Sequence, residues 1–102
     1  ETVDGLPERV VADLLASDRR RRLLACLADR GGCLPVTDLA AAVAAREAGT
    51  DIETVDPERH RAVRDEIYER HLPKLTATGV VEFDSMRGTV TLSGTGIAEE
   101  WR

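Results

Sequence analysis

The stretch HLPKLTATGVVEFD, residues 71–84, decides the fold because its apolar residues change from a helical to a strand period. Its first residues keep the three-and-four spacing of a helix face, and Gly79 is a typical helix end. After this glycine, Val81 and Phe83 alternate with acidic residues, and after a short turn residues 89–92 repeat the strand pattern. The sequence therefore predicts a helix that leads directly into a β-hairpin.

The helix that enters this stretch is expected to begin at Asp56-Pro57, because proline is preformed for the first helical position. Its apolar spacing continues to about Thr78. Pro73 lacks a backbone donor and clashes with the preceding turn, so we expect a kink or a short break there.

The elements before this long helix follow from local signals. We expect a short helix over residues 7–15, a helix capped by Ser17 and ended by Gly31-Gly32, an extended segment at 34–36, a helix from about Thr37 to Gly49, and a polar loop without helical period over 49–56.

Helix, short strand, helix, helix and hairpin is the element order of a winged helix-turn-helix. We therefore predict a mainly α single domain with a small β-hairpin over residues 1–102, because the chain is too short to support a second core. The core is expected at about 13–92, with a tail over 93–102 whose last residues add a helical turn. In this fold the third core helix can enter a major groove, and the hairpin can touch the flanking backbone.

Composition limits the cell compartment and the kind of partner. No apolar run approaches the roughly 18 to 20 residues of a membrane span and no leader is visible, so we expect a soluble, cytoplasmic protein. There are 19 acidic against 14 basic residues, and only Lys74 is a lysine. An acidic excess with arginine in place of lysine is a composition typical of halophilic archaea. A net charge of −5 argues against ordinary nucleic-acid binding, but the argument weakens in molar salt, where the counterion-release contribution largely vanishes.

The cysteines and histidines do not indicate a metal or cofactor. Cys26 and Cys33 are too few for a disulfide framework, and buried reduced thiols are favoured over a redox or metal role. His60 and His71 lie eleven residues apart on one expected helix, about 16 Å along its axis, so they cannot share one ion. We expect neither a metal nor another cofactor.

Four segments carry a family resemblance: residues 17–24, 47–51, 71–75 and 79–84, within a span of 13–92. On these segments the chain resembles a haloarchaeal winged-helix family of unknown function. The stretch from Tyr68 to Gly79 also resembles, more distantly, the recognition-helix end of ArsR-type repressors. The loop at 49–56 is longer than the turn of a simple helix-turn-helix, and no thiol cluster marks a metal-sensing site. The resemblance implies a transcription-factor-like fold without a known target.

Candidate DNA contacts lie on the long helix and the hairpin tip, where arginine can pair with guanine or with phosphate. They are Arg59, Arg61, Arg64, Arg70, Lys74 and Arg87. Against this interpretation, Asp65, Glu66 and Glu69 on the same helix would repel phosphates and could pair with arginines three or four residues away. A solvated, salt-bridged helix face is the alternative.

A run of four arginines opens the second helix, at residues 19–22. Consecutive helical positions point in four directions, so these arginines cannot form one surface, and carboxylates such as Asp18 are their expected partners. His71 is expected to be packed on the inner face, whereas His60 is either a pH-sensitive contact or an ordinary exposed side chain.

The sequence leaves two functions open. The first is a DNA-binding regulator, expected as a homodimer with contacts around Val10, Leu14 and Trp101. The second is a winged-helix module that recognises protein through its acidic long helix. An enzyme is not expected, because no activated nucleophile, phosphate-binding loop or metal-ligand spacing is present in the sequence.

Overall fold

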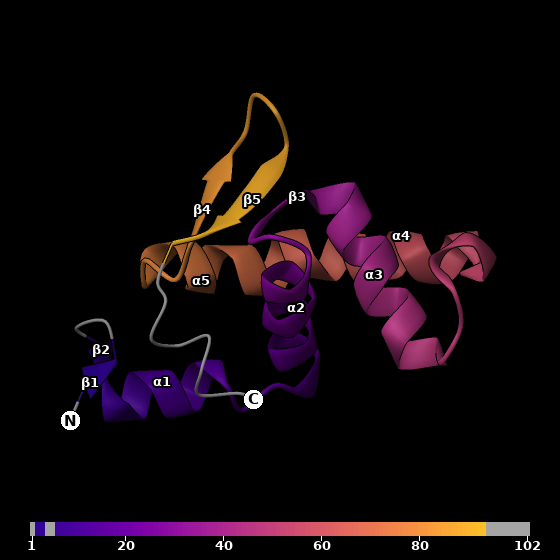
Figure 1. Cartoon of the computed structure of the whole chain (residues 1–102). Coiled ribbons are helices and arrows are strands. Elements are labelled where there is room, and N and C mark those ends of the chain that lie inside the picture. Colours follow the sequence, from indigo (N-terminus) through magenta and orange to yellow (C-terminus); the bar gives the residue numbers. More distant parts are fainter. Residues whose placement is uncertain (1, 4–5, 94–102) are drawn as a thin grey trace.

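Helices α2 and α3 and a long helical rod surround an aliphatic core, and a hairpin projects from the rod (Figure 1). The computed structural model describes residues 2–3 and 6–93. In chain order the elements are β1 (Thr2–Val3), β2 (Leu6–Pro7), α1 (Glu8–Leu14), α2 (Asp18–Asp29), β3 (Cys33–Pro35), α3 (Val36–Ala48), the 3-10 turn η1 (Ile52–Thr54), α4 (Pro57–Glu66), the π-helical segment η2 (Ile67–His71), α5 (Leu72–Ala77), β4 (Val81–Asp84) and β5 (Thr89–Leu92).

The predicted fold class, a mainly helical domain with a winged-helix arrangement, is confirmed. The local signals act as expected: the Ser17 side chain accepts a hydrogen bond from the backbone N–H of Arg20, and Gly49 ends α3 with φ of 71°. The sheet order is β3-β5-β4, all antiparallel, so the extended segment before α3 pairs with the second strand of the hairpin. This pairing ties the hairpin to the start of α3.

The core is aliphatic, as the scarcity of aromatic residues requires. Fully buried side chains come from every major element: Leu23, Leu24 and Leu27 of α2, Leu39 and Val43 of α3, Val63, Ile67 and Leu75 of the rod, and Val81 and Val90 of the strands. Each element therefore buries one side, and the opposite side of the rod is left to solvent.

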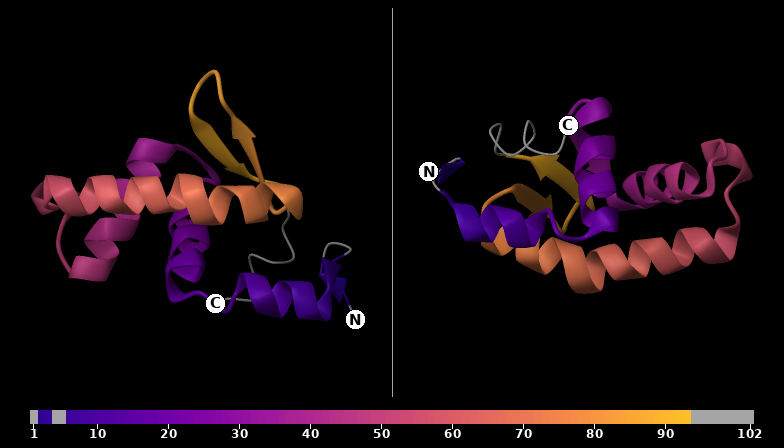
Figure 2. Two further views of the ribbon diagram at one scale, coloured as in Figure 1. Left: turned by 180° about the vertical axis from the view of Figure 1, so that it is seen from behind. Right: turned by 90° about the horizontal axis from the view of Figure 1, so that it is seen from below.

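The rod α4–η2–α5 is continuous from residue 57 to residue 77, as both views of Figure 2 show. The irregularity expected at Pro73 lies before the proline, in the π-helical turn of η2, where the Leu72 N–H donates to the Ile67 carbonyl five residues back. Because Pro73 has no N–H and its ring crowds the carbonyl four residues back, a widened turn accommodates it without breaking the helix.

The N-terminal part and the loop 49–56 differ in detail from the sequence expectation, and one further expectation is not tested. The first helix spans Glu8–Leu14 rather than 7–15, and it follows a short antiparallel pair, β1 with β2, that was not predicted. The loop 49–56 contains a 3-10 turn at Ile52–Thr54, although it shows no helical period. The expected final helical turn, with Trp101, lies outside the described residues.

Candidate nucleic-acid interface

One side of the rod faces away from the core. Helical spacing of three, four and seven residues puts one set of exposed positions on the side opposite the core. This outer stripe consists of Glu58, Arg61, Ala62, Asp65, Tyr68 and Glu69, all of them exposed. It contains more carboxylates than arginines, so the stripe by itself is not a basic surface.

The arginines predicted to contact DNA do not converge on one side of α4. Arg61 and Arg64 lie three residues apart and share a side, where Arg64 forms an ion pair of 3.3 Å with Asp65. Arg59 lies two residues before Arg61, roughly 200° around the helix from it. Arg59, Arg61 and Arg70 are exposed, and their side chains form no hydrogen bond or ion pair with the described residues. They remain available to a partner.

The other two predicted contacts are Lys74 and Arg87, and only the first has a side-chain partner within the described part of the chain. The Lys74 Nζ lies 2.8 Å from the Asp13 carboxylate, so this lysine ties α5 to α1, and it holds the pKa of Asp13 below its usual value. Arg87 lies at the exposed hairpin tip and has no side-chain bond within the described part of the chain. Of the two, Arg87 is the freer.

The hairpin tip has a defined shape. The Asp84 carboxylate accepts from the backbone N–H of Met86 (2.9 Å) and of Arg87 (3.2 Å), and Gly88 turns the chain with φ of 67°. The Gly88 carbonyl then accepts from Val36 at the start of α3. This turn holds Met86, which is 93% exposed, and Arg87 at the end of the hairpin.

An aromatic contact fixes the hairpin against the rod. The rings of Tyr68 and Phe83 meet edge to face with their centroids 5.9 Å apart, and Tyr68 is 43% exposed. The chain contains only three aromatic residues, and two of them meet here, where Phe83 also packs against the edge of the core. The contact couples the position of the hairpin to that of the outer stripe.

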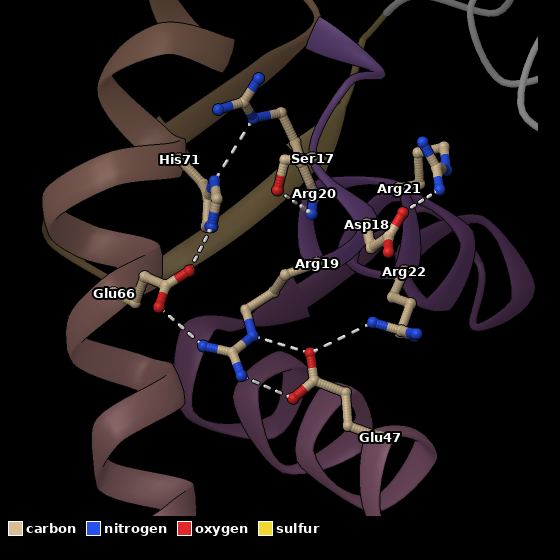
Figure 3. A network of polar contacts seen from close by, with 9 residues as sticks. All are labelled: Ser17, Asp18, Arg19, Arg20, Arg21, Arg22, Glu47, Glu66 and His71. Atoms are coloured by element: carbon tan, nitrogen blue, oxygen red, sulfur yellow. Dashed lines mark hydrogen bonds and ion pairs between the residues drawn. The ribbon is translucent and has the colours of Figure 1, made fainter.

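The arginine run of α2 is engaged inside the molecule, as Figure 3 shows. Arg19 holds Glu47 of α3 with two contacts of 2.7 Å and Glu66 of α4 with a third of 2.7 Å. The hydrogen bond to Glu47 is the main cause that raises the pKa of Arg19. Arg22 adds an ion pair of 3.6 Å to Glu47, and Arg21 pairs with Asp18, the partner expected for the run.

Arg20 is the only member of the run that is buried, with 8% of its surface exposed. Its Nη1 donates to the carbonyls of Asp13 (3.0 Å) and Leu14 (3.1 Å), and its Nε donates to His71 Nδ1 (3.3 Å). One side chain thus joins the end of α1, the start of α2 and the η2 turn of the rod.

His71 is buried on the inner face, as predicted, and both of its ring nitrogens are bonded. Nδ1 accepts from Arg20, so the proton lies on Nε2, which donates to Glu66 at 2.9 Å. Burial lowers the pKa of His71, against the opposing hydrogen bond with Glu66, and Arg20 lowers it further. Burial alone would raise the pKa of Glu66, but the hydrogen bond from His71 and the charge of Arg19 lower it.

The remaining predicted residues are placed as follows. His60 is half-buried and its Nε2 donates to the Thr37 carbonyl at 2.9 Å. Neither cysteine forms a disulfide. Cys26 is buried, and its burial raises the pKa of its thiol. Cys33 is exposed, so the prediction of a buried thiol is wrong for Cys33. Glu66 pairs with α2 rather than with neighbouring arginines of its own helix.

The dimer contacts expected from the sequence fall in different environments. Leu14 is fully buried in the core of its own chain, so its side chain offers no surface to a second copy in the described structure. Val10 is half-buried, and Trp101 lies outside the described residues.

No helix in residues 2–3 and 6–93 is long and apolar enough to cross a membrane. Within the same residues no cluster of three His, Cys, Asp or Glu side chains could hold a metal ion.

Comparison with known proteins gives one match. A family model described as "Domain of unknown function (DUF7344)" matches residues 12–91, which cover α2, the rod and nearly all of the hairpin. No curated protein and no solved structure matches the chain.

Proposed function

The chain belongs to the DUF7344 family of domains of unknown function, and we propose that it is a DNA-binding transcriptional regulator that uses the rod as a reader helix and the hairpin as a wing. Three core helices, with the rod as the third, and a three-stranded sheet in the order β3-β5-β4 support this proposal. In such folds the third helix enters the major groove, and the wing touches the flanking backbone.

One observation carries the proposal: the arginines divide into an engaged group and an available group. The four arginines of α2 are used within the chain, whereas Arg59, Arg61, Arg70 and Arg87 on the reader helix and wing are exposed and unpaired among the described residues. Arg9 and Arg30 on the scaffold are exposed and unpaired in the same way, so four of these six arginines lie on the reader helix and wing. Residues 57–77 hold five basic and four acidic side chains, a balance of +1, in a chain of net charge −5. The rod as a whole is therefore less acidic than the rest of the chain, although its outer stripe holds three carboxylates and one arginine.

The acidic remainder suits a cytoplasm of high salt, so the proposal extends to a halophilic archaeon. In molar salt a globally basic surface gains little, because the counterion-release contribution is small there. Direct contacts from a few arginines would then carry the binding. We also propose that the regulator acts as a homodimer, since two-fold symmetry presents two reader helices to a palindromic site.

A second function is favoured by the outer stripe itself. Glu58, Asp65 and Glu69 lie on the same side of the rod as Arg61 and would oppose the approach of phosphates. A partner protein with a basic surface would meet the same stripe without this penalty. A winged-helix interaction module is therefore the alternative.

Duplex binding measured across a salt series separates the two functions. We expect a fluorescent duplex to bind and to remain bound near molar salt, and we expect the double variant R61A/R64A to weaken binding by about tenfold or more. The matched control is R9A/R30A, which removes the same charge from exposed arginines of α1 and of the α2 end. Equal weakening by the two double variants would contradict the assigned surface, and absence of binding at any salt would favour the interaction module.

A further inference from the structure

Both histidines of the chain lie on the rod, and each bonds it to a different part of the scaffold. His60 in α4 donates to the Thr37 carbonyl in the first turn of α3. His71 in η2 accepts from Arg20 of α2. The reader helix is thus attached at two histidines, eleven residues apart.

The two attachments respond differently to a proton. His60 uses its bonded nitrogen as a donor, and a doubly protonated imidazole still donates there. His71 uses Nδ1 as an acceptor, so protonation removes the acceptor and places a positive charge about 3.3 Å from Arg20 Nε. Only the attachment at His71 is lost when the ring becomes charged.

Arg20 cannot easily move away from a charged His71. Its guanidinium is buried, and its Nη1 is held by two carbonyls at the end of α1. When His71 becomes charged, the contacts that break are therefore those that hold the rod and not those that hold Arg20 to α1. The attached part of the rod is η2, a π-helical turn, and such turns are irregular points within helices.

Arg20, Glu66 and Arg19 act on His71 directly, and further charged groups of the neighbouring elements contact these three residues or lie beside them in the chain. Together these groups are Arg19 and Arg20 of α2, Glu47 of α3 beyond Arg19, Glu66 of α4, Arg70 of η2, and the Lys74–Asp13 pair that joins α5 to α1. Among the described residues, Glu66 is the one carboxylate bonded directly to the ring, and Arg19 shares it. A charged His71 would therefore keep the carboxylate that it already contacts, which Arg19 shares, and would face the guanidinium of Arg20, which is held by two carbonyls.

We infer that Arg20 and His71 are positioning residues that hold the reader helix against α2, and that protonation of His71 releases this attachment and weakens duplex binding. The inference rests on the proposed function for its DNA readout only. Protonation of buried histidines is a known means of switching interfaces between pH 5 and pH 8.

The direction of the effect distinguishes this device from simple charge. Acidification makes the protein less negative, and a proton on His71 adds positive charge to the reader helix itself. General electrostatics would therefore strengthen DNA binding at low pH. Loss of the attachment at His71 predicts the opposite, namely that duplex binding weakens as the pH falls.

The DNA test measures duplex affinity at constant salt between about pH 8 and about pH 5.5. We expect the wild-type protein to lose about five- to tenfold in affinity across this range. We expect H71Q to lose the dependence, because the glutamine carbonyl can accept from Arg20 and its amide can donate to Glu66 without titrating. The control variant H60Q keeps His71 and should keep the weakening. A wild-type affinity that rises or stays level on acidification, or an H71Q dependence equal to that of the wild type, would overturn the inference.

A second measurement needs no DNA and no variant. In NMR spectra of the wild-type protein, we expect the His71 ring to be protonated on Nε2 at about pH 8, and we expect the backbone amides of residues 19–21 and 66–72 to shift with its titration. If these amides ignore the titration, or if the ring stays neutral until the fold is lost, the inference is wrong. A protein that binds no duplex at any pH but shows the coupled shifts would refute the proposed function and leave the attachment established.

Discussion

At the side chain of Arg20, α1, α2 and the rod meet. Burial of an arginine is costly unless its donors find acceptors, and here two carbonyls and one imidazole nitrogen accept from three of its five N–H groups. Arg21, its neighbour in sequence, pairs with Asp18 near the surface. The two residues are identical in type and differ only in environment.

Replacement of Arg20 by alanine should therefore cost far more stability than the same change at Arg21. We expect R20A to lower the free energy of unfolding by about 2 to 4 kcal/mol, because three buried acceptors lose a charged donor. We expect R21A to lower it by about 1 kcal/mol or less, as for other half-exposed pairs. Urea unfolding of both variants measures this, and equal losses would show that Arg20 is not a structural hub.

His71 makes the stability of the free protein depend on pH. Its pKa in the folded state lies below the usual 6.5, so between these two values the unfolded chain binds more protons. The contribution of neutral His71 to the free energy of unfolding is complete above about pH 6.5. It is lost as the pH falls through the lowered pKa. Unfolding curves of the wild type should show this loss and those of H71Q should not.

Glu66 provides a separate and later step in the same experiment. Its lowered pKa contributes stability above its usual 4.5, which is lost as the pH falls further. The loss linked to His71 begins below about pH 6.5, and the loss linked to Glu66 begins below about pH 4.5. A stability that rises between pH 7 and pH 5 in the wild type would contradict the neutral, buried state of His71.

At the scale of elements, signals confined to a few neighbouring residues predicted the structure well. Ser17, Gly49 and the change of period at Gly79 each set an element boundary, because capping and turn conformations depend on local geometry. The order of elements then indicated a winged-helix arrangement. The β1–β2 pair and the 3-10 turn in the loop carry no comparable signal.

Long-range polar contacts were not predictable in the same way. Arg19 meets Glu47 and Glu66, 28 and 47 residues away, and Arg20 meets His71, 51 residues away. Glu66 and His71 are five residues apart, a spacing that does not bring side chains together on a regular α-helix. The π-helical turn brings them within 2.9 Å, and the signal that could have indicated it is Pro73.

Pro73 is accordingly the residue to change in order to test the origin of η2. In P73A the new backbone N–H can donate to the Glu69 carbonyl, so we expect a regular α-helical turn and loss of the contact between Glu66 and His71. A crystal structure of the variant measures both features. Persistence of the π-helical turn would show that packing around His71, and not the proline, causes it.

Over the whole molecule, ion pairs join the helices to one another, and most of the exposed, unpaired arginines of the described residues lie on the rod and the wing tip. Ion pairs join α2 to α3 and to the rod, and α1 to α5, whereas the exposed arginines of α4 and the wing tip remain unpaired within the described residues. Charges satisfied inside the fold favour a single arrangement of the helices. Charges left open favour contact with an acidic partner, and this division is the basis of the proposed function.

The most direct test of this proposal is to map which residues meet a duplex. Titration of the isotopically labelled protein with a DNA duplex, followed by backbone amide shifts in NMR spectra, reports every contacting segment at once. We predict that the largest shifts fall at residues 57–65 of the reader helix and at 84–88 of the wing tip. Shifts concentrated on α1 and the α2 end around Arg30, or no shifts at any salt concentration, would contradict the assignment of the rod and hairpin as a DNA-reading unit.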